Sequence, residues 1–251
     1  MVGFLLGLAS VATAQITVSV ADVGITAAST DTGSLNVTAG DYVVFAGAVN
    51  YNSGVDRTVD LTFSITGGTG SASLNHLDTP SVQDINTFVS YGQVTGSGTL
   101  DFSASLDLAG TNSNWAAFVV SGTNLSVLAT AQQYNNTSDT TNTYTWGGSM
   151  ASAVVIEAVG SNSSTFGFGL TTQSIADDGT STATDGSRRW VVHDSFENQT
   201  SWVSTYSNNG GNKKFSVNGI AITSVPEPST FALLGGLAAL GLVIYRRRVR
   251  A

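Results

Sequence analysis

The chain has 251 residues, a formal net charge of −8 at pH 7, no cysteine and only 10% charged residues. This length suits one large or two small domains, and the composition is too apolar for a disordered polyelectrolyte and too polar for a multi-span membrane protein. The lack of cysteine excludes disulfides, zinc-thiolate sites and thiol nucleophiles.

The body of the chain is more acidic than its total charge indicates. Between Gln15 and Val225 there are five basic residues against sixteen acidic ones, because the other basic residues lie near the C-terminus. Such a body repels phosphate backbones. We therefore expect no nucleic-acid partner.

Residues 1–14 have the pattern of a signal peptide. An apolar stretch precedes Ala12-Thr13-Ala14, the small-x-small pattern that signal peptidase accepts, although no Lys or Arg precedes the stretch. We predict cleavage after Ala14, with Ala12 and Ala14 as the recognised residues, and signal peptidase and the general secretion machinery as partners. The alternative is a buried first strand, which the glycines of this stretch disfavour.

Residues 15–224 read as an extracytoplasmic domain made of short β-strands separated by Gly, Asn, Asp and Ser. Alternation is clearest where Leu61, Phe63 and Ile65 interleave with polar residues, the two-residue period of a strand with one wet face. Such strands indicate an all-β, antiparallel β-sandwich or jelly-roll-like ectodomain. The twelve predicted strands are 16–23, 41–49, 58–66, 98–108, 115–122, 125–131, 143–148, 152–159, 164–172, 188–194, 201–207 and 214–223.

The body also contains a weak internal echo. The segment YVVFAGAVNYNSG that follows Ala39-Gly40-Asp41 is similar to SMASAVVIEAVGSNSS, which follows Gly147-Gly148. Each segment is an apolar strand followed by a turn rich in Asn and Ser. We take this as an indication of fold, and it names no ligand.

Catalytic patterns are scarce. The chain has only two histidines, His76 and His193, which excludes a multi-histidine metal site within one chain. The run His193-Asp194-Ser195 does not favour a catalytic triad, because successive residues of a strand point to opposite faces. We expect no enzymatic activity and no cofactor.

Glu157 interrupts an apolar strand, and we expect it at an exposed rim, with a functional groove as the alternative. A hydrolase that uses carboxylates such as Glu157 and Asp194 is therefore one open hypothesis. The four tryptophans, Trp115, Trp146, Trp190 and Trp202, would form a sugar-binding platform if exposed, but tryptophans in sandwiches usually belong to the core.

An acidic loop at 176–186 contains Asp177, Asp178 and Asp185 among glycines. Their oxygens are ligands that Ca²⁺ prefers, but the spacing is not that of an EF-hand. This loop is a weak calcium candidate, and the alternative is a solvated turn.

The C-terminus, 225–251, combines three elements. Val225-Pro226-Glu227-Pro228-Ser229 is followed by an uncharged stretch at 230–245 and by a basic tail at 246–251 with Arg246, Arg247, Arg248 and Arg250. Sixteen helical residues reach about 24 Å, slightly short of a bilayer core, and arginines can extend to headgroups. We predict one short transmembrane helix at 230–245 with the arginines cytoplasmic. The alternatives are a core helix for the stretch and a rigid spacer for the prolines.

This tail resembles the PEP-CTERM sorting signal of bacterial exported proteins, and the resemblance covers only about the last 27 residues. It implies that an exosortase recognises Pro226, Glu227 and Pro228, removes the tail and passes the body from the inner membrane to the cell surface or extracellular matrix. The implied function is structural or adhesive, for example in a biofilm matrix with extracellular polysaccharide as a partner. A carbohydrate-binding module is the alternative.

Overall fold

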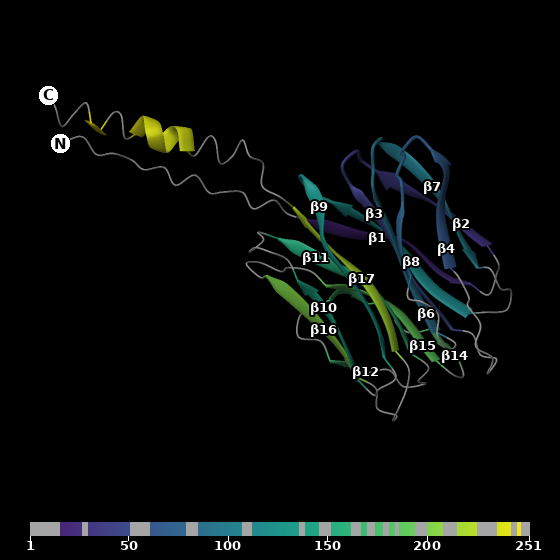
Figure 1. Cartoon of the computed structure of the whole chain (residues 1–251). Coiled ribbons are helices and arrows are strands. Elements are labelled where there is room, and N and C mark those ends of the chain that lie inside the picture. Colours follow the sequence, from purple (N-terminus) through teal and green to yellow (C-terminus); the bar gives the residue numbers. More distant parts are fainter. Residues whose placement is uncertain are drawn as a thin grey trace.

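The structure is a computed structural model that describes residues 16–26, 30–50, 61–78, 85–106, 112–135, 139–145, 152–161, 167–169, 174–177, 181–183, 186–193, 200–207, 215–224, 235–241 and 245–246. These residues form antiparallel β-strands and a short helix at 235–241 (Figure 1). The prediction of an antiparallel all-β body is therefore confirmed.

Two sheets make up the first half of the body. The first inner sheet has the strand order β1-β8-β3-β6-β5, and the first outer sheet has the order β2-β7-β4. Their strands are β1 (Thr17–Thr26), β2 (Thr30–Val37), β3 (Tyr42–Asn50), β4 (Leu61–Gly68), β5 (Asn75–Asp78), β6 (Ile85–Gln93), β7 (Gly98–Leu106) and β8 (Asn112–Ser121).

Two further sheets make up the second half. The second inner sheet has the order β13-β15-β11-β17-β9, with β14 also paired to β15, and the second outer sheet has the order β10-β16-β12. Their strands are β9 (Leu125–Asn135), β10 (Asp139–Thr145), β11 (Ala153–Ser161), β12 (Gly167–Gly169), β13 (Ser174–Asp177), β14 (Ser181–Ala183), β15 (Gly186–His193), β16 (Ser201–Ser207) and β17 (Phe215–Ser224).

All twelve predicted strands occur in the structure; 201–207 has the predicted ends, and the others have shifted ends. The strands that sequence reasoning missed are β2, β5, β6, β13 and β14. β2 (TDTGSLNV) has few apolar residues, and β6 (INTFVSYGQ) places Asn86, Thr87 and Ser90 in buried positions. These polar residues hide the strand pattern.

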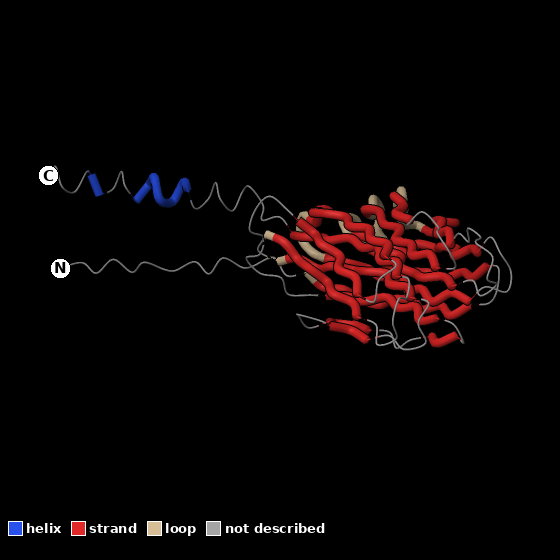
Figure 2. The backbone as a smooth tube through the Cα atoms, turned by 60° about the horizontal axis from the view of Figure 1, so that its bottom comes forward, coloured by secondary structure: helices blue, strands red, loops and turns tan. Residues whose placement is uncertain are grey.

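The four sheets stack face to face, with both inner sheets in the middle (Figures 1 and 2). In β3, Val43 and Phe45 belong to the cluster shared with the first outer sheet, whereas Val44 and Ala46 belong to the cluster between the inner sheets. Alternate residues thus point to two different apolar layers. A strand buried on both faces has no wet side, which explains why β3 and β11 read as nearly continuous apolar runs.

The second half repeats the strand order of the first. If the strands of each half are counted from its own first strand, β1 or β9, and the short β14 is left out, the two halves have the same order. The inner sheet then has the order first, eighth, third, sixth, fifth, and the outer sheet has the order second, seventh, fourth. The similarity between the segments that contain β3 and β11 therefore reflects equivalent strands in the two halves. Residues 122–124 alone join β8 to β9, so the halves follow each other directly.

A β-bulge fixes the register of this repeat. In β1, one extra residue lies between Val20 and Asp22, opposite the Phe118–Ala117 step of β8. In β9, the extra residue is Leu128, opposite the Ile222–Ala221 step of β17. Because bulges bend a strand at a defined place, the same bulge in both halves shows which residues are equivalent. Ala117 and Ala221 are therefore equivalent. Trp115 and Gly219, which each lie two residues earlier, are equivalent as well.

Aromatic side chains fill the outer layer of the first half. The Phe45 ring centroid lies 5.0 Å from those of both Phe63 and Phe102, and Trp115 meets Phe63 and Phe102 edge-on at 5.9 and 5.7 Å. Offset and edge-on pairs add to the free energy gained from burial. This cluster holds the first outer sheet onto β3 and β8.

Phe102→Ala should lower the free energy of unfolding by about 3–5 kcal/mol, because it leaves a cavity beside the Phe45 and Trp115 rings. Urea unfolding of the purified body measures the change. The control is Ser103→Ala, which alters a half-exposed neighbour in β7 and should cost less than about 0.5 kcal/mol. Equal losses in the two variants would contradict the packing described.

Candidate functional site

The C-terminal segment starts at the end of a fully paired strand. β17 lies between β11 and β9, and its last residue, Ser224, pairs with Leu125. The predicted sorting residues Val225, Pro226, Glu227, Pro228 and Ser229 lie outside the described residues. Few residues therefore separate the core of the body from the Pro-Glu-Pro triplet.

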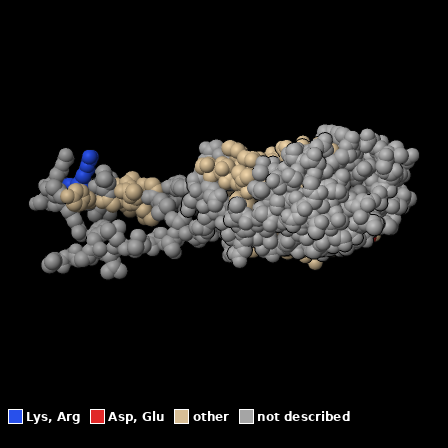
Figure 3. All heavy atoms as spheres, turned by 90° about the horizontal axis from the view of Figure 1, so that it is seen from below, with Lys and Arg blue, Asp and Glu red and all other residues tan. Residues whose placement is uncertain are grey.

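The helix at 235–241 presents its apolar side chains to solvent: Leu237 and Leu240 are 56% and 57% exposed. No helix in the described part of the chain combines the length and the apolar character that crossing a membrane requires. Arg246 is exposed and is the one Lys or Arg whose side chain the structure describes (blue in Figure 3). Arg247, Arg248 and Arg250 lie outside the described residues.

The structure describes only some of the residues of the other predicted sites. Ala12 and Ala14 lie outside the described residues. Asp177 is the last residue of β13, its side chain is not described, and Asp178 and Asp185 lie outside. Among the described side chains, no group of three His, Cys, Asp or Glu residues could hold a metal ion.

The sugar-platform hypothesis fails for three of the four tryptophans. Trp115, Trp190 and Trp202 are at most 4% exposed, and Trp146 lies outside the described residues. Trp190 packs edge-on against Phe118 between the two inner sheets, with ring centroids 5.1 Å apart. These rings belong to the core and cannot stack on a sugar in solution.

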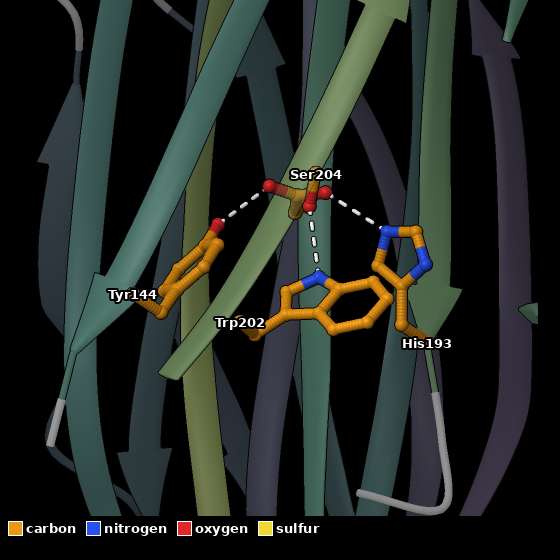
Figure 4. A network of polar contacts seen from close by, with 5 residues as sticks. Tyr144, His193, Trp202 and Ser204 are labelled. Carbon is orange, nitrogen blue, oxygen red and sulfur yellow. Dashed lines mark hydrogen bonds and ion pairs between the residues drawn. The ribbon is translucent and has the colours of Figure 1, made fainter. Parts of the chain in front are cut away.

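Glu157 lies at the centre of a buried polar network, so its prediction as an exposed rim residue is wrong. Its side chain has no solvent exposure. The Tyr144 hydroxyl of β10 donates a hydrogen bond of 2.7 Å to Glu157 Oε1, and His193 Nε2 of β15 lies 2.9 Å from Oε2 (Figure 4). The sequence misled because Val155, Glu157 and Val159 face a second outer sheet and not solvent.

Gly219 makes this geometry possible. It pairs with Glu157 across β11 and β17. A Cβ atom there would collide with the Tyr144 hydroxyl and would lie 2.7 Å from Glu157 Cγ. A glycine inside a buried strand marks a close approach of another group, here the tyrosine from the outer sheet.

The second outer sheet encloses the network. The Trp202 ring lies 5.4 Å from the His193 ring, and Trp202 Nε1 donates a hydrogen bond of 3.0 Å to Ser204 Oγ (Figure 4). His193 Nδ1 is buried without a hydrogen-bond partner. The network is thus closed to solvent on the side of β16 and has one unused polar atom on the imidazole.

The first half carries an apolar counterpart at the same position. There, Gly47 of β3 pairs with Trp115 of β8, whereas in the second half Glu157 pairs with Gly219. A Cβ atom on Gly47 would lie 2.8 Å from Trp115 Cβ. The large and small residues have exchanged strands, and the volume that an indole fills in one half holds a carboxylate and a phenol in the other.

This enclosure decides what the network can do chemically. A glycosidase carboxylate must reach its substrate, and Glu157 has no exposed surface. Glu157 therefore cannot serve as a catalytic carboxylate of a hydrolase. Asp194 and Ser195 lie outside the described residues. What the arrangement provides is a polar connection between two sheets, in which Glu157 and His193 are fully buried.

Gly219→Ala should lower the free energy of unfolding by about 2–4 kcal/mol, because the new methyl group displaces the Tyr144 hydroxyl from a buried carboxylate. Chemical denaturation measures the loss. In Gly67→Ala, the added methyl group would make an ordinary contact of 3.5 Å with Asp101, so stability should change little. A Gly219→Ala protein as stable as Gly67→Ala would contradict the close approach.

Comparison with known families identifies the tail. Residues 224–248 match the family model of the PEP-CTERM protein-sorting motif. No curated protein and no solved structure matches the chain significantly. The motif match confirms the resemblance of the tail and indicates an exported protein that an exosortase sorts, and it begins at the last residue of β17.

Proposed function

We propose that this chain, which carries a PEP-CTERM protein-sorting motif, is a noncatalytic envelope or extracellular-matrix protein with a structural or adhesive role. The motif match at residues 224–248 is the single observation that carries the proposal. The body suits the role because its described strands build two tandem jelly-roll-like sandwiches whose aromatic residues serve packing. Extracellular polysaccharide is the partner that such a location supplies.

The two ends of the chain act in successive steps of export and sorting. Signal peptidase removes residues 1–14 after Ala14. The stretch 230–245 then holds the protein in the inner membrane, with the arginines at 246–251 on the cytoplasmic side. Exosortase reads Pro226, Glu227 and Pro228 outside the bilayer, where two prolines favour an extended backbone that an enzyme can bind.

The junction with the body supports recognition of the folded protein. Five extended residues, 225–229, reach at most about 18 Å. Ser224 is buried and paired within the second inner sheet. The sorting enzyme therefore meets its triplet close to a folded sheet, and trimming into β17 would remove a strand that has neighbours on both sides.

Replacing Pro226, Glu227 and Pro228 together with alanine in the native host should leave the full-length protein in the membrane fraction. The unchanged protein should appear as a shorter form at the surface or in the medium. Immunoblots of fractionated cells measure both size and location. Pro80→Ala is the control, since it alters the one proline outside the motif. Identical size and location for the triple variant and the unchanged protein would contradict the proposal.

A further inference from the structure

The strands β8 and β9 follow each other in the chain but belong to different sheets. β8 lies between β1 and β3 in the first inner sheet, whereas β9 pairs with β17 in the second. Only residues 122–124 separate the two strands. Consecutive strands with so short a connection commonly pair as an antiparallel hairpin. The fold therefore has a local competitor, in which β8 pairs with β9.

This competitor fits the strand repeat. In the second inner sheet, β17 lies between β9 and β11, antiparallel to both, and β8 is its equivalent in the first half. A hairpin of β8 and β9 would thus place β8 in the position of β17. In the register of the repeat, Val120 then takes the place of Ser224 opposite Leu125, which leaves residues 121–124 as the loop. Loops of this length are common in hairpins.

The order of synthesis also favours the competitor. β9 ends at Asn135, whereas β17 begins only at Phe215. Local contacts form sooner than distant ones because they close a shorter loop, and the N-terminal parts of a chain are the first to fold. β8 therefore meets β9 before β17 has been made. Correct folding needs a feature that disfavours β8 in the second inner sheet.

The pair of residues nearest the bulge does not supply this feature. Among the residues that face the outer sheets, Phe45 of β3 pairs with Ala117, and Val155 of β11 pairs with Ala221. The larger residue lies on the equivalent strand in both halves. β8 beside β11 would set Ala117 opposite Val155, the same combination of residue types as in the native pair. This position gives no preference for the native partner.

The next pair on the same faces has the opposite order of size. Gly47 of β3 pairs with Trp115 of β8, whereas Glu157 of β11 pairs with Gly219 of β17. β8 in the place of β17 would therefore set Trp115 opposite Glu157. The space above Gly219 does not accept even a methyl group, because a Cβ atom there would lie 2.7 Å from Glu157 Cγ and would collide with the Tyr144 hydroxyl. An indole overpacks the site severely.

The wrong pairing also breaks a buried polar contact. The Tyr144 hydroxyl passes above Gly219 and donates a hydrogen bond of 2.7 Å to Glu157 Oε1. An indole at the position of Gly219 occupies the place of this hydroxyl and separates it from the carboxyl group. Buried polar groups that lose a partner disfavour the arrangement in which they lose it.

The strand that is displaced fits its new place no better. If β17 replaced β8 beside β3, Gly219 would lie opposite Gly47. The volume of the Trp115 side chain, which contacts Phe63 and Phe102 edge-on, would then be empty. Cavities in an apolar core are destabilising. The exchange of β8 and β17 thus overpacks one half and leaves a cavity in the other.

We propose that the two reversed pairs, Gly47–Trp115 and Glu157–Gly219, determine which strand enters which half. They reject the hairpin of β8 and β9 within one chain, and they equally reject the exchange of these strands between two copies. Glu157 and Gly219 are thus specificity-determining residues of strand pairing. Buried polar residues and steric mismatches are established ways to select one partner over a similar one. This role is independent of the envelope or matrix function proposed above.

A pair of introduced cysteines reports the wrong pairing, since the chain has no cysteine of its own. If β8 lay beside β11, Ser113 would take the place of Val217 opposite Val159. In the native structure, Ser113 lies opposite Val49 on the face toward the first outer sheet, and Val159 belongs to an apolar cluster of the second half. Directly opposite residues of antiparallel strands lie about 4.5–5.5 Å apart at Cα, within reach of a disulfide.

Refolding from urea in a glutathione buffer tests the proposal. The wrong-pair reporter carries Ser113→Cys and Val159→Cys, and the native-pair reporter carries Ser113→Cys and Val49→Cys. Mass spectrometry of peptides measures the fraction of each disulfide, within chains and between them. The wrong-pair disulfide should reach at most about a tenth of the yield of the native pair, because overpacking disfavours it by that factor or more. Equal yields would overturn the proposal.

Substitutions at one position separate pairing specificity from a merely structural role. Glu157→Ala makes β11 resemble β3, so Trp115 fits opposite it and the yield of the wrong-pair disulfide should rise at least about tenfold. Glu157→Gln is the matched control, because it removes the carboxyl group but keeps its size, and its yield should stay close to that of the unchanged reporter. An equal rise in the two variants, or no rise in Glu157→Ala, would contradict the assigned role.

A second variant covers the case in which Glu157→Ala does not fold. Trp115→Ala relaxes the same mismatch from the side of β8 and should also increase the wrong-pair disulfide. If it folds without this increase, the proposal is overturned. If neither variant folds, the comparison of the two reporters in the otherwise unchanged chain still decides.

Discussion

The packing of the two inner sheets against each other is the constraint on which the rest of the body depends. Val44, Ala46 and Phe118 of the first inner sheet meet Ile156 and Trp190 of the second. Each inner sheet must also cover its other face, because its strands alternate between two apolar sides. The outer sheets supply this cover, and their strands come from the chain segments that connect the inner strands. The layering of the four sheets thus follows from this one buried contact.

Within this repeat, the two halves solve one packing problem in opposite ways. The Gly47–Trp115 pair places the large side chain on β8, and the Glu157–Gly219 pair places it on β11. The exchange keeps one glycine in each pair, but it changes the chemistry from an indole to a carboxyl group with two hydrogen-bonding partners. The halves therefore share an architecture but differ in the chemistry of this position, which is apolar in the first half and holds a buried, hydrogen-bonded carboxyl group in the second.

Much of this was predictable from local patterns, and the rest depended on distant contacts. The alternation of Leu61 and Phe63 identified β4, and the tail was recognisable because its three elements are contiguous. Glu157 was misplaced because a lone carboxylate in an apolar strand normally indicates an exposed edge. The signals that were present, Gly219 in a buried strand and a similar segment earlier in the chain, acquire meaning only through strand pairing. No local pattern links Tyr144 of β10 to Glu157 of β11, because they meet across two sheets.

The amide exchange of β3 and β11 in the intact body, followed at neutral pH in increasing denaturant, tests the central claim most directly. If the inner sheets form one shared core, both strands should be among the most protected of the chain and should exchange together through global unfolding. Loss of protection in β11 at denaturant concentrations that leave β3 fully protected would contradict the account, since the two halves would then be independent units.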